Sequence, residues 1–199
     1  MTSLGTLDYY NKNAEAFVDG TINVDFRKTQ DKFLSLIPGK RVLDFGCGSG
    51  RDTKYFLDAG LEVYAIDGSE ELCKRAALYT GISIRKMLFQ ELDEIDRYDG
   101  IWACSSILHL PKNELKQVFI KMIRALSGNG VIYTSFKYGE FEGERNGRFF
   151  TDFTEKSFND FIKDIDNIQL VEEWITADVR PSRSNERWLN LILRKLITD

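Results

Sequence analysis

A glycine-rich turn between a strand-like run and a helix-like run is the part of this sequence best suited to chemistry. In VLDFGCGSGRD, residues 42–52, the glycines Gly46, Gly48 and Gly50 let a ligand approach the backbone closely. The free N–H groups at the start of the following helix suit an anionic group, so the segment is typical of a nucleotide-type ligand site. A strand-to-helix turn that merely needs glycine explains the pattern equally well.

The residues around this turn favour one cofactor class over another. A dinucleotide-binding G-x-G-x-x-G pattern would place its third glycine at position 51, where this sequence has the bulky Arg51. Asp44, two residues before the first glycine, suits a ligand with an ammonium group close to the loop. Asp67 ends the next strand-like run, where a carboxylate can accept both hydroxyls of a ribose, although a simple helix-capping role also explains it.

The segments that position these residues alternate between strand-like and helix-like patterns. The strand-like runs are short and rich in β-branched residues, and they span residues 41–45, 62–66, 82–86, 98–104 and 129–136. Such alternation predicts βαβ units and a parallel sheet. Helices are expected from Gly50 to Gly60, from the N-cap Ser69 to Gly81, over 112–127 with Gly128 as its end, and after the cap Thr154.

The last third of the chain has a different character. Residues 137–153 are charged and punctuated by glycine, and we expect them to form a loop that faces the substrate. The final strand-like runs, 168–176 and 188–196, are joined by a loop too short for a crossover helix and should pair antiparallel. The sequence therefore predicts an α/β, Rossmann-like fold with a seven-stranded sheet, mostly parallel with the last strand antiparallel, and helices on both faces.

Length and composition limit the class of protein. With 199 residues, 43% hydrophobic residues and 3 prolines, the chain is expected to form one compact domain with a sizeable core. The 27 basic and 31 acidic residues leave a net charge of -4, which disfavours nucleic acid and anionic membranes as partners. Three widely separated cysteines and a single histidine argue against disulfides or a metal site, and no run is apolar enough for a membrane span or signal sequence. We therefore expect a cytoplasmic protein.

Four segments together resemble the class I S-adenosylmethionine-dependent methyltransferases. VLDFGCGSGRD is similar to their first cofactor motif and EVYAIDGS to the second, while YDGIWACSSILHLP and ALSGNGVIYTSFK resemble the segments of the fourth and fifth strands. The Gly-Arg-Asp ending of the first motif and the Leu-His pair resemble in particular small bacterial, tellurite-resistance-like enzymes of the methyltransferase type 11 group. The resemblance spans nearly the whole chain and implies S-adenosylmethionine as cofactor and S-adenosylhomocysteine as product.

The resemblance implies which residues hold the methionine and ribose parts of that cofactor. Asp44 and the backbone of Gly46, Cys47 and Gly48 would hold the methionine ammonium and flank the sulfonium. Asp67 would bind the ribose.

Further positions are implied for the rest of the cofactor. Gly68 and Ser69 would lie against the adenosine, and Met87 and Phe89 would flank the adenine. Many relatives place an acid after the third strand, whereas this chain has KMLFQ, so the adenine amino group would bond to backbone or to Gln90. Facing the methionine part would be two residues that core packing explains equally well, Cys104 and Ser105.

The N-terminal stretch DYYNKNAEAF, residues 8–17, resembles the lid helix that closes over the cofactor in such enzymes. Tyr10 is the candidate contact, and Arg27 is a candidate partner of the methionine carboxylate, although a surface salt bridge also explains this arginine. We expect a single methyltransferase domain, with lid helices in 1–37, a cofactor-binding half in 38–136 and a substrate-facing half in 137–199.

The acceptor side of the site follows from the same resemblance. Methyl transfer from a sulfonium is an in-line displacement, so positioning and desolvation are the main contributions of the protein. His109 follows the fourth strand and could take a proton from the acceptor, although a histidine that packs against the turn is equally consistent. A basic and aromatic rim would favour an acidic or planar small molecule and comprises Lys137, Tyr138, Arg148, Arg180 and Trp188. Interleaved glutamates could instead neutralise these cations in a solvated loop.

Three functions compete at this point. A small-molecule methyltransferase is favoured because the chain has the minimal catalytic fold and no appended recognition domain. An RNA methyltransferase would require a clustered basic face, which the acidic charge balance disfavours. The third function is a non-catalytic S-adenosylmethionine-binding protein. In each case we expect a monomer or a homodimer.

Overall fold

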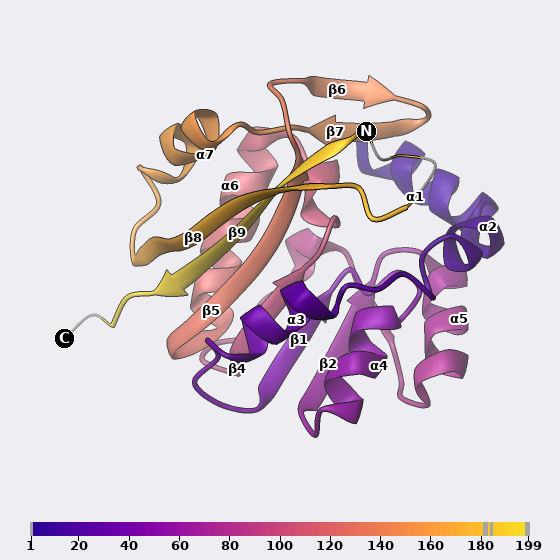
Figure 1. The fold of residues 1–199 in the computed structure, drawn as a ribbon, viewed down its shortest axis with the longest axis horizontal. Helices are drawn as coiled ribbons and strands as arrows, with labels where there is room; N and C mark the ends of the chain where they lie inside the picture. Colours follow the sequence, from indigo (N-terminus) through magenta and orange to yellow (C-terminus); the bar gives the residue numbers. More distant parts are fainter. Residues whose placement is uncertain (1, 181–182, 184, 198–199) are drawn as a thin grey trace.

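Residues 2–180, 183 and 185–197 are described by the computed structural model, in which seven strands form one mixed sheet (Figure 1). Their order across the sheet is β3-β2-β1-β4-β5-β9-β8. The bounds are β1 Arg41–Phe45, β2 Glu62–Asp67, β3 Arg85–Lys86, β4 Tyr98–Ala103, β5 Leu126–Lys137, β8 Ile168–Ala177 and β9 Arg187–Lys195. Strands β1 to β5 pair in parallel, whereas β9 pairs antiparallel with both β5 and β8. The predicted fold class is confirmed.

Helices cover both faces of the sheet, as Figure 1 shows. On one face Leu43 of β1 packs in the same core cluster as Phe119. On the other face the ring centroid of Trp102 of β4 lies 5.2 Å from those of both Phe33 and Phe56. None of the described helices is long and apolar enough to cross a bilayer. The helices are α1 Thr2–Lys12, α2 Ala14–Asp19, α3 Arg27–Leu34, α4 Arg51–Asp58, α5 Glu70–Thr80, α6 Lys112–Ala125 and α7 Glu155–Ile162, with single 3₁₀ turns η1 Phe89–Glu91 and η2 Ile107–His109.

The helix ends expected from the sequence are largely confirmed. The hydroxyl of Ser69 accepts a hydrogen bond from the N–H of Leu72 at 3.2 Å, and Gly81 ends α5 in the left-handed conformation with φ of 78°. Thr154 accepts from the N–H of Ser157 at 3.2 Å and begins α7. These caps define the two helices by local chemistry that the sequence carries.

One helix end differs from the expectation. Helix α6 ends at Ala125 rather than 127, β5 begins at the next residue, and Gly128 lies inside that strand. The last carbonyls of α6 need no glycine cap, because Ala125 accepts from the N–H of Arg97 at 2.8 Å and Arg124 accepts from Asp96 at 3.0 Å.

The third strand is also shorter than the expected 82–86. Only Arg85–Lys86 is in the sheet, where it pairs with Ile66 and Asp67 of β2. Strand β3 lies at one edge of the sheet, so no second neighbour extends its pairing.

A β-hairpin occupies the segment 137–153 that was expected to be a loop. Its strands are β6 Glu142–Arg145 and β7 Arg148–Thr151, paired antiparallel. The two-residue turn between them consists of Asn146 and Gly147, with φ of 53° and 74°. Positive φ at both positions is the geometry of the type I′ hairpin turn, for which Asn-Gly is the preferred pair.

The hairpin lies against the N-terminal helix, so segments far apart in the sequence meet over one end of the sheet (Figure 1). The N–H of Phe149 donates to the hydroxyl of Thr6 on α1 at 3.1 Å. The guanidinium of Arg148 lies 4.4 Å from the ring centroid of Tyr9. Helix α1 and hairpin β6–β7 together form a cover over the carboxyl ends of the parallel strands.

The N-cap of α7 offers a test of the fold away from that cover. Thr154→Ala removes the hydroxyl that accepts from Ser157, so we expect the free energy of unfolding in urea to fall by about 1 kcal/mol. Thr154→Ser keeps the hydroxyl and should unfold close to the wild type. An equal loss in both variants would contradict the capping role.

Candidate cofactor and acceptor site

A cavity opens at the carboxyl ends of the parallel strands, where the strand order reverses between β1 and β4. Ligands of open α/β sheets bind at such a switch point. The cavity wall includes most of the residues that the sequence predicts for the site, namely Tyr10, Gly46, Cys47, Gly48, Asp67, Gly68, Met87, Phe89, Cys104, Ser105, His109, Lys137, Arg148, Arg180 and Trp188. Four predicted residues are not on this wall: Arg27, Asp44, Ser69 and Tyr138.

The glycine turn after β1 is pressed against the segments that follow β2 and β4. At Gly46, with φ of 92°, an added Cβ would lie 2.5 Å from the Cβ of Ser106, so no other residue fits. The N–H groups of Gly46 and Cys47 both donate to the carbonyl of Ile66, at 3.0 and 2.9 Å. The glycines are therefore needed for close packing as well as for ligand access.

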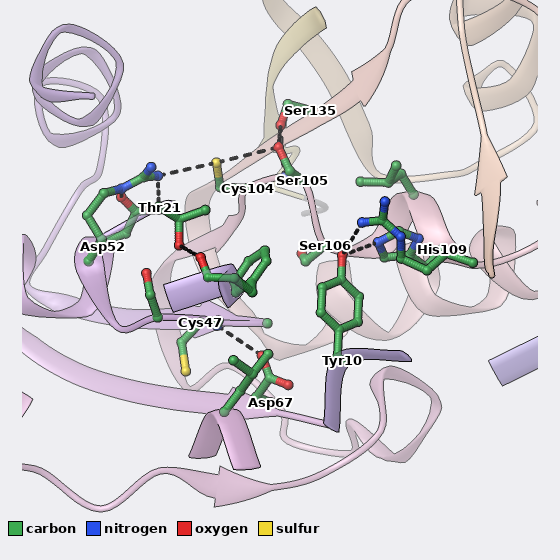
Figure 2. Close-up of a pocket in the computed structure, with 18 of the residues that line it drawn as sticks. Tyr10, Thr21, Cys47, Asp52, Asp67, Cys104, Ser105, Ser106, His109 and Ser135 are labelled. Atoms are coloured by element: carbon green, nitrogen blue, oxygen red, sulfur yellow. Dashed lines mark hydrogen bonds and ion pairs between the residues drawn. The ribbon is translucent and has the colours of Figure 1, made fainter. Parts of the chain in front are cut away.

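Asp67 joins this turn to the start of α5. Its Oδ2 accepts from the N–H of Gly48 at 2.9 Å (Figure 2). Its Oδ1 accepts from the N–H of Ser69 at 2.8 Å. Burial raises the pKa of the Asp67 carboxyl, while these backbone donors act in the opposite direction. Each oxygen keeps a further acceptor site, which suits a pair of neighbouring hydroxyls in the cavity.

Two predicted cofactor contacts lie elsewhere. The carboxyl of Asp44 is 2% exposed and accepts from the hydroxyl of Thr53 at 2.6 Å. Burial, reinforced by the nearby Asp52, holds the pKa of Asp44 well above its usual range, which weakens the case for an ionic contact with an ammonium group. Arg27 forms a two-bond salt bridge with Asp25 at the surface, with 71% of its side chain exposed. Their positions do not support the expected direct contacts.

The other two residues off the wall have structural partners. Ser69 caps α5, and its hydroxyl donates to Oδ1 of Asn11 at 2.7 Å, which ties α1 to α5. Tyr138 is exposed and donates to Glu155 at 2.9 Å. Ser69 thus acts on the site through the lid, and Tyr138 is not part of the rim.

Arg51 and Asp52 form a buried network that the sequence pattern did not assign to the site. Both carboxylate oxygens of Asp52 accept from Arg51 at 2.8 Å, and they also accept from Gln30 at 2.7 Å and Trp102 at 2.8 Å. The guanidinium of Arg51 lies 4.8 Å from the ring centroid of Phe26 and lines the cavity. A charged pair directly after a glycine turn is the signal that could have identified them.

The wall near the fourth and fifth strands is polar. The N–H of Ser105, which has a positive φ of 51°, donates to the hydroxyl of Ser135 at 2.9 Å. Burial raises the pKa of the Cys104 thiol to about 12, so this group stays protonated and neutral. Gln90, the predicted substitute for the missing acid, lines the cavity, but its amide donates to Glu114 at 2.6 Å.

His109 and Tyr10 join the sheet to the lid helix. His109 Nδ1 lies 2.6 Å from the carbonyl oxygen of Phe149, which can only accept, so Nδ1 carries the proton. Its Nε2 therefore accepts from the hydroxyl of Tyr10 at 2.8 Å, as Figure 2 shows. Burial and the nearby cations Arg148, Arg145 and Lys137 lower the pKa of His109 to about 4, although its bond to Phe149 acts in the opposite direction. The imidazole is neutral at pH 7 and is a weak base in this state.

The basic rim is largely neutralised by its own acids. Lys137 pairs with Glu186, and Arg180 pairs with Asp178 at 2.6 Å. The indole N–H of Trp188 also donates to Asp178, at 3.0 Å. Neutralisation by interleaved acids, the alternative left open by the sequence, therefore describes much of this rim.

The single histidine gives a direct test of the lid junction. We expect NMR titration of the imidazole to give a pKa near 4 and the Nδ1–H tautomer. Because the unfolded state, with a pKa near 6.5, binds the proton more tightly, the free energy of unfolding should fall as pH drops from about 6.5 to 4, by roughly 3 kcal/mol from this group.

His109→Gln serves as the control for that titration, since its stability should depend less on pH across the same window. A folded-state pKa close to 6.5 in the wild type would contradict the buried, neutral imidazole.

Comparisons with known proteins relate this chain to methyltransferases. Residues 42–130 match the model of a methyltransferase domain family. The chain is 32% identical over 112 residues to the putative methyltransferase YqeM of Bacillus subtilis, covering 50% of this chain and 45% of that protein. It is 33% identical over 84 residues to a ubiquinone biosynthesis O-methyltransferase of Rhodopseudomonas palustris, covering 40% of this chain and 33% of that protein. The matches thus span less than half the length of these relatives.

Solved structures share the fold over almost the whole chain. The Burkholderia thailandensis 1,6-didemethyltoxoflavin-N1-methyltransferase, with 1,6-didemethyltoxoflavin and S-adenosylhomocysteine bound, superimposes with a TM-score of 0.75 at 22% identity, covering 96% of this chain and 85% of that one. The N-methyltransferase NodS of Bradyrhizobium japonicum, also with S-adenosylhomocysteine, gives a TM-score of 0.68 at 16% identity, covering 93% and 97%. The tellurite-resistance-like subgroup stays a prediction. Residues 42–130 thus carry a methyltransferase domain, and together with the shared fold this match supports a class I S-adenosylmethionine-dependent methyltransferase, an enzyme whose cofactor is S-adenosylmethionine.

Proposed function

We propose that this protein transfers the methyl group of S-adenosylmethionine to a small-molecule acceptor by in-line displacement. One observation carries the proposal: a single cavity extends from the glycine turn to the aromatic and basic rim on β7 and on the segment between β8 and β9. Helix α1 and hairpin β6–β7 cover this cavity, and covered cavities suit small molecules better than the surface of a macromolecule.

The residues present fit the cofactor. Gly46, Cys47 and Gly48 of the turn line the cavity, and Asp67 offers carboxylate oxygens to a ribose diol. Met87 and Phe89 supply an apolar wall for an adenine base. When bound, the cofactor supplies a methyl group activated by its sulfonium.

The remaining chain would orient the acceptor and exclude water. Tyr10 of helix α1 and the neutral His109 lie together on the cavity wall. If a hydroxyl or nitrogen acceptor displaces Tyr10 from Nε2, that atom is the one available to receive the acceptor's proton. His109 is the candidate catalytic residue on this basis.

The proposal extends to the acceptor class and the organisation of the chain. Relatives named as ubiquinone biosynthesis O-methyltransferases and a structure with bound 1,6-didemethyltoxoflavin support a small-molecule acceptor. Within the proposed single domain, residues 1–37 close the site, 38–136 bind the cofactor and 137–199 face the acceptor. A cytoplasmic location and a monomeric or homodimeric state remain parts of this proposal.

Two other functions make different predictions. An RNA methyltransferase should shift bulk tRNA in a salt-sensitive gel assay, which the net charge of -4 disfavours. A non-catalytic cofactor-binding protein should bind S-adenosylmethionine but release no S-adenosylhomocysteine with any acceptor of a small-molecule panel. Release of S-adenosylhomocysteine that depends on a small molecule would support the proposed enzyme.

Asp67 provides the test of the cofactor assignment. We expect Asp67→Ala to weaken binding of S-adenosylhomocysteine by one to two orders of magnitude in calorimetry, roughly 1.5–3 kcal/mol, because paired hydrogen bonds are lost. NAD should not bind the wild type.

Asp58→Ala, a change at an exposed acid of α4, is the matched control and should leave cofactor affinity unchanged. Thermal unfolding of both variants separates lost binding from lost folding. Wild-type affinity in a folded Asp67→Ala protein would contradict the ribose assignment.

A further inference from the structure

Arg148 of β7 differs from the other cations of the cavity wall. Arg51, Lys137, Arg180 and Arg183 each have an acidic partner within 4.0 Å, namely Asp52, Glu186, Asp178 and again Glu186. Among the described residues no carboxylate lies within that distance of Arg148. Within the described part of the chain, the wall therefore carries one cation that has no acidic partner.

One edge of the Arg148 guanidinium has no hydrogen-bond partner within the described part of the chain. Nη1 donates to the hydroxyl of Tyr10 at 3.3 Å, whereas the buried Nε has no partner and Nη2 donates to no described residue. A buried donor without a partner is costly, more so when it belongs to a charged group. Its presence on a cavity wall points to a ligand that supplies the missing acceptor.

The same edge holds a carboxylate elsewhere in this protein. In Arg41, Arg51 and Arg180, Nε and Nη2 donate side by side to the two oxygens of an aspartate. This two-bond geometry is the strongest arrangement of guanidinium and carboxylate. In Arg148 the same two atoms, Nε and Nη2, are the ones without a described partner.

The surroundings of Arg148 suit a planar acid. Its guanidinium lies 4.4 Å from the ring centroid of Tyr9 and 5.1 Å from that of Phe150, and Trp188 is on the same cavity wall. Two further cations near His109 are already paired, Arg145 with Asp152 and Lys137 with Glu186. An anionic group would therefore find its partner in Arg148.

The methionine carboxylate of the cofactor is the competing anion. Asp52 pairs with Arg51, which directly follows the glycine turn. Figure 2 shows Asp52 on the opposite side of the cavity from Tyr10 and His109. Arg148 bonds to Tyr10 and so lies on the latter side, away from Arg51 and Asp52. This separation favours the acceptor over the cofactor.

We propose, on the basis of the proposed function, that Arg148 is the specificity-determining residue for the acceptor. The acceptor carries a carboxylate on a planar ring, and this carboxylate binds the Nε–Nη2 edge of the arginine. His109 and Tyr10 lie beside that subsite, so the bound carboxylate orients the ring against the group that can receive a proton.

The test uses benzoate and its neutral isostere benzamide as probes, with the single histidine as reporter. The protein is titrated with each probe by NMR and calorimetry, with and without saturating S-adenosylhomocysteine, at low and constant ionic strength. We expect benzoate to bind at least about tenfold more tightly than benzamide and to raise the pKa of His109, because its charge offsets that of Arg148. Equal affinity of the two probes for the wild type would overturn the proposal.

Variants separate the proposed contact from general effects. Arg148→Gln should abolish both the preference for benzoate and the rise in the pKa of His109. Arg148→Lys should keep part of the preference, since the positive charge remains but the two-bond edge is lost. Arg85→Gln, at an exposed arginine of β3 that pairs with Glu94, is the matched control and should keep the full preference. A folded Arg148→Gln protein that retains the preference would refute the assignment.

Cofactor binding distinguishes the remaining outcomes. Wild-type S-adenosylhomocysteine affinity in Arg148→Gln supports the acceptor subsite, whereas a loss of about tenfold or more would mean that the arginine holds the cofactor's carboxylate, which contradicts the proposal. If the wild type does not bind S-adenosylhomocysteine, the proposed methyl transfer is contradicted. The preference for benzoate over benzamide, measured without cofactor, would still show whether Arg148 forms an anion subsite.

Discussion

The cavity depends on the close approach between the turn after β1 and the segment after β4. Gly46 leaves only enough room for Ser106, and the same turn is bonded through Gly48 to the carboxylate of Asp67 at the end of β2. A side chain at Gly46 would force apart the strand ends that form the floor of the cavity. The glycine pattern therefore has two physical roles, one in packing the sheet ends and one in admitting a ligand to the backbone.

The lid depends on a few directional polar contacts. Tyr10 donates to His109, Asn11 accepts from Ser69, and Thr6 accepts from the backbone of Phe149. Each such hydrogen bond contributes only a small net free energy, so the position of α1 rests on several of them together. Because His109 also bonds to Phe149, the same imidazole connects the lid, the fourth strand segment and the hairpin.

Charge is distributed unevenly over the cavity wall. Near the glycine turn Asp52 is satisfied by four hydrogen bonds, two of them from Arg51, which keeps a buried ion pair fully partnered. At the rim Asp178 balances Arg180 and Glu186 balances Lys137, whereas Arg148 lies near the rings of Tyr9 and Phe150 with no acid among the described residues beside it. Ion pairs that are complete within the protein contribute shape, and the incomplete one is where a ligand can contribute charge.

Apart from the hairpin β6–β7, the sequence by itself determined the order of strands and helices in the fold, the parallel sheet and the antiparallel last strand, because period, caps and connection lengths are local properties. It also located the glycine turn and Asp67, whose chemistry follows from neighbours in the chain. Tertiary structure alone decided that Asp44 bonds to Thr53, away from the cavity wall, and that Arg148 meets Tyr10 from 138 residues away. Which cations are neutralised also depends on partners brought together by folding, and side-chain pairing across such distances leaves no periodic signal in the sequence.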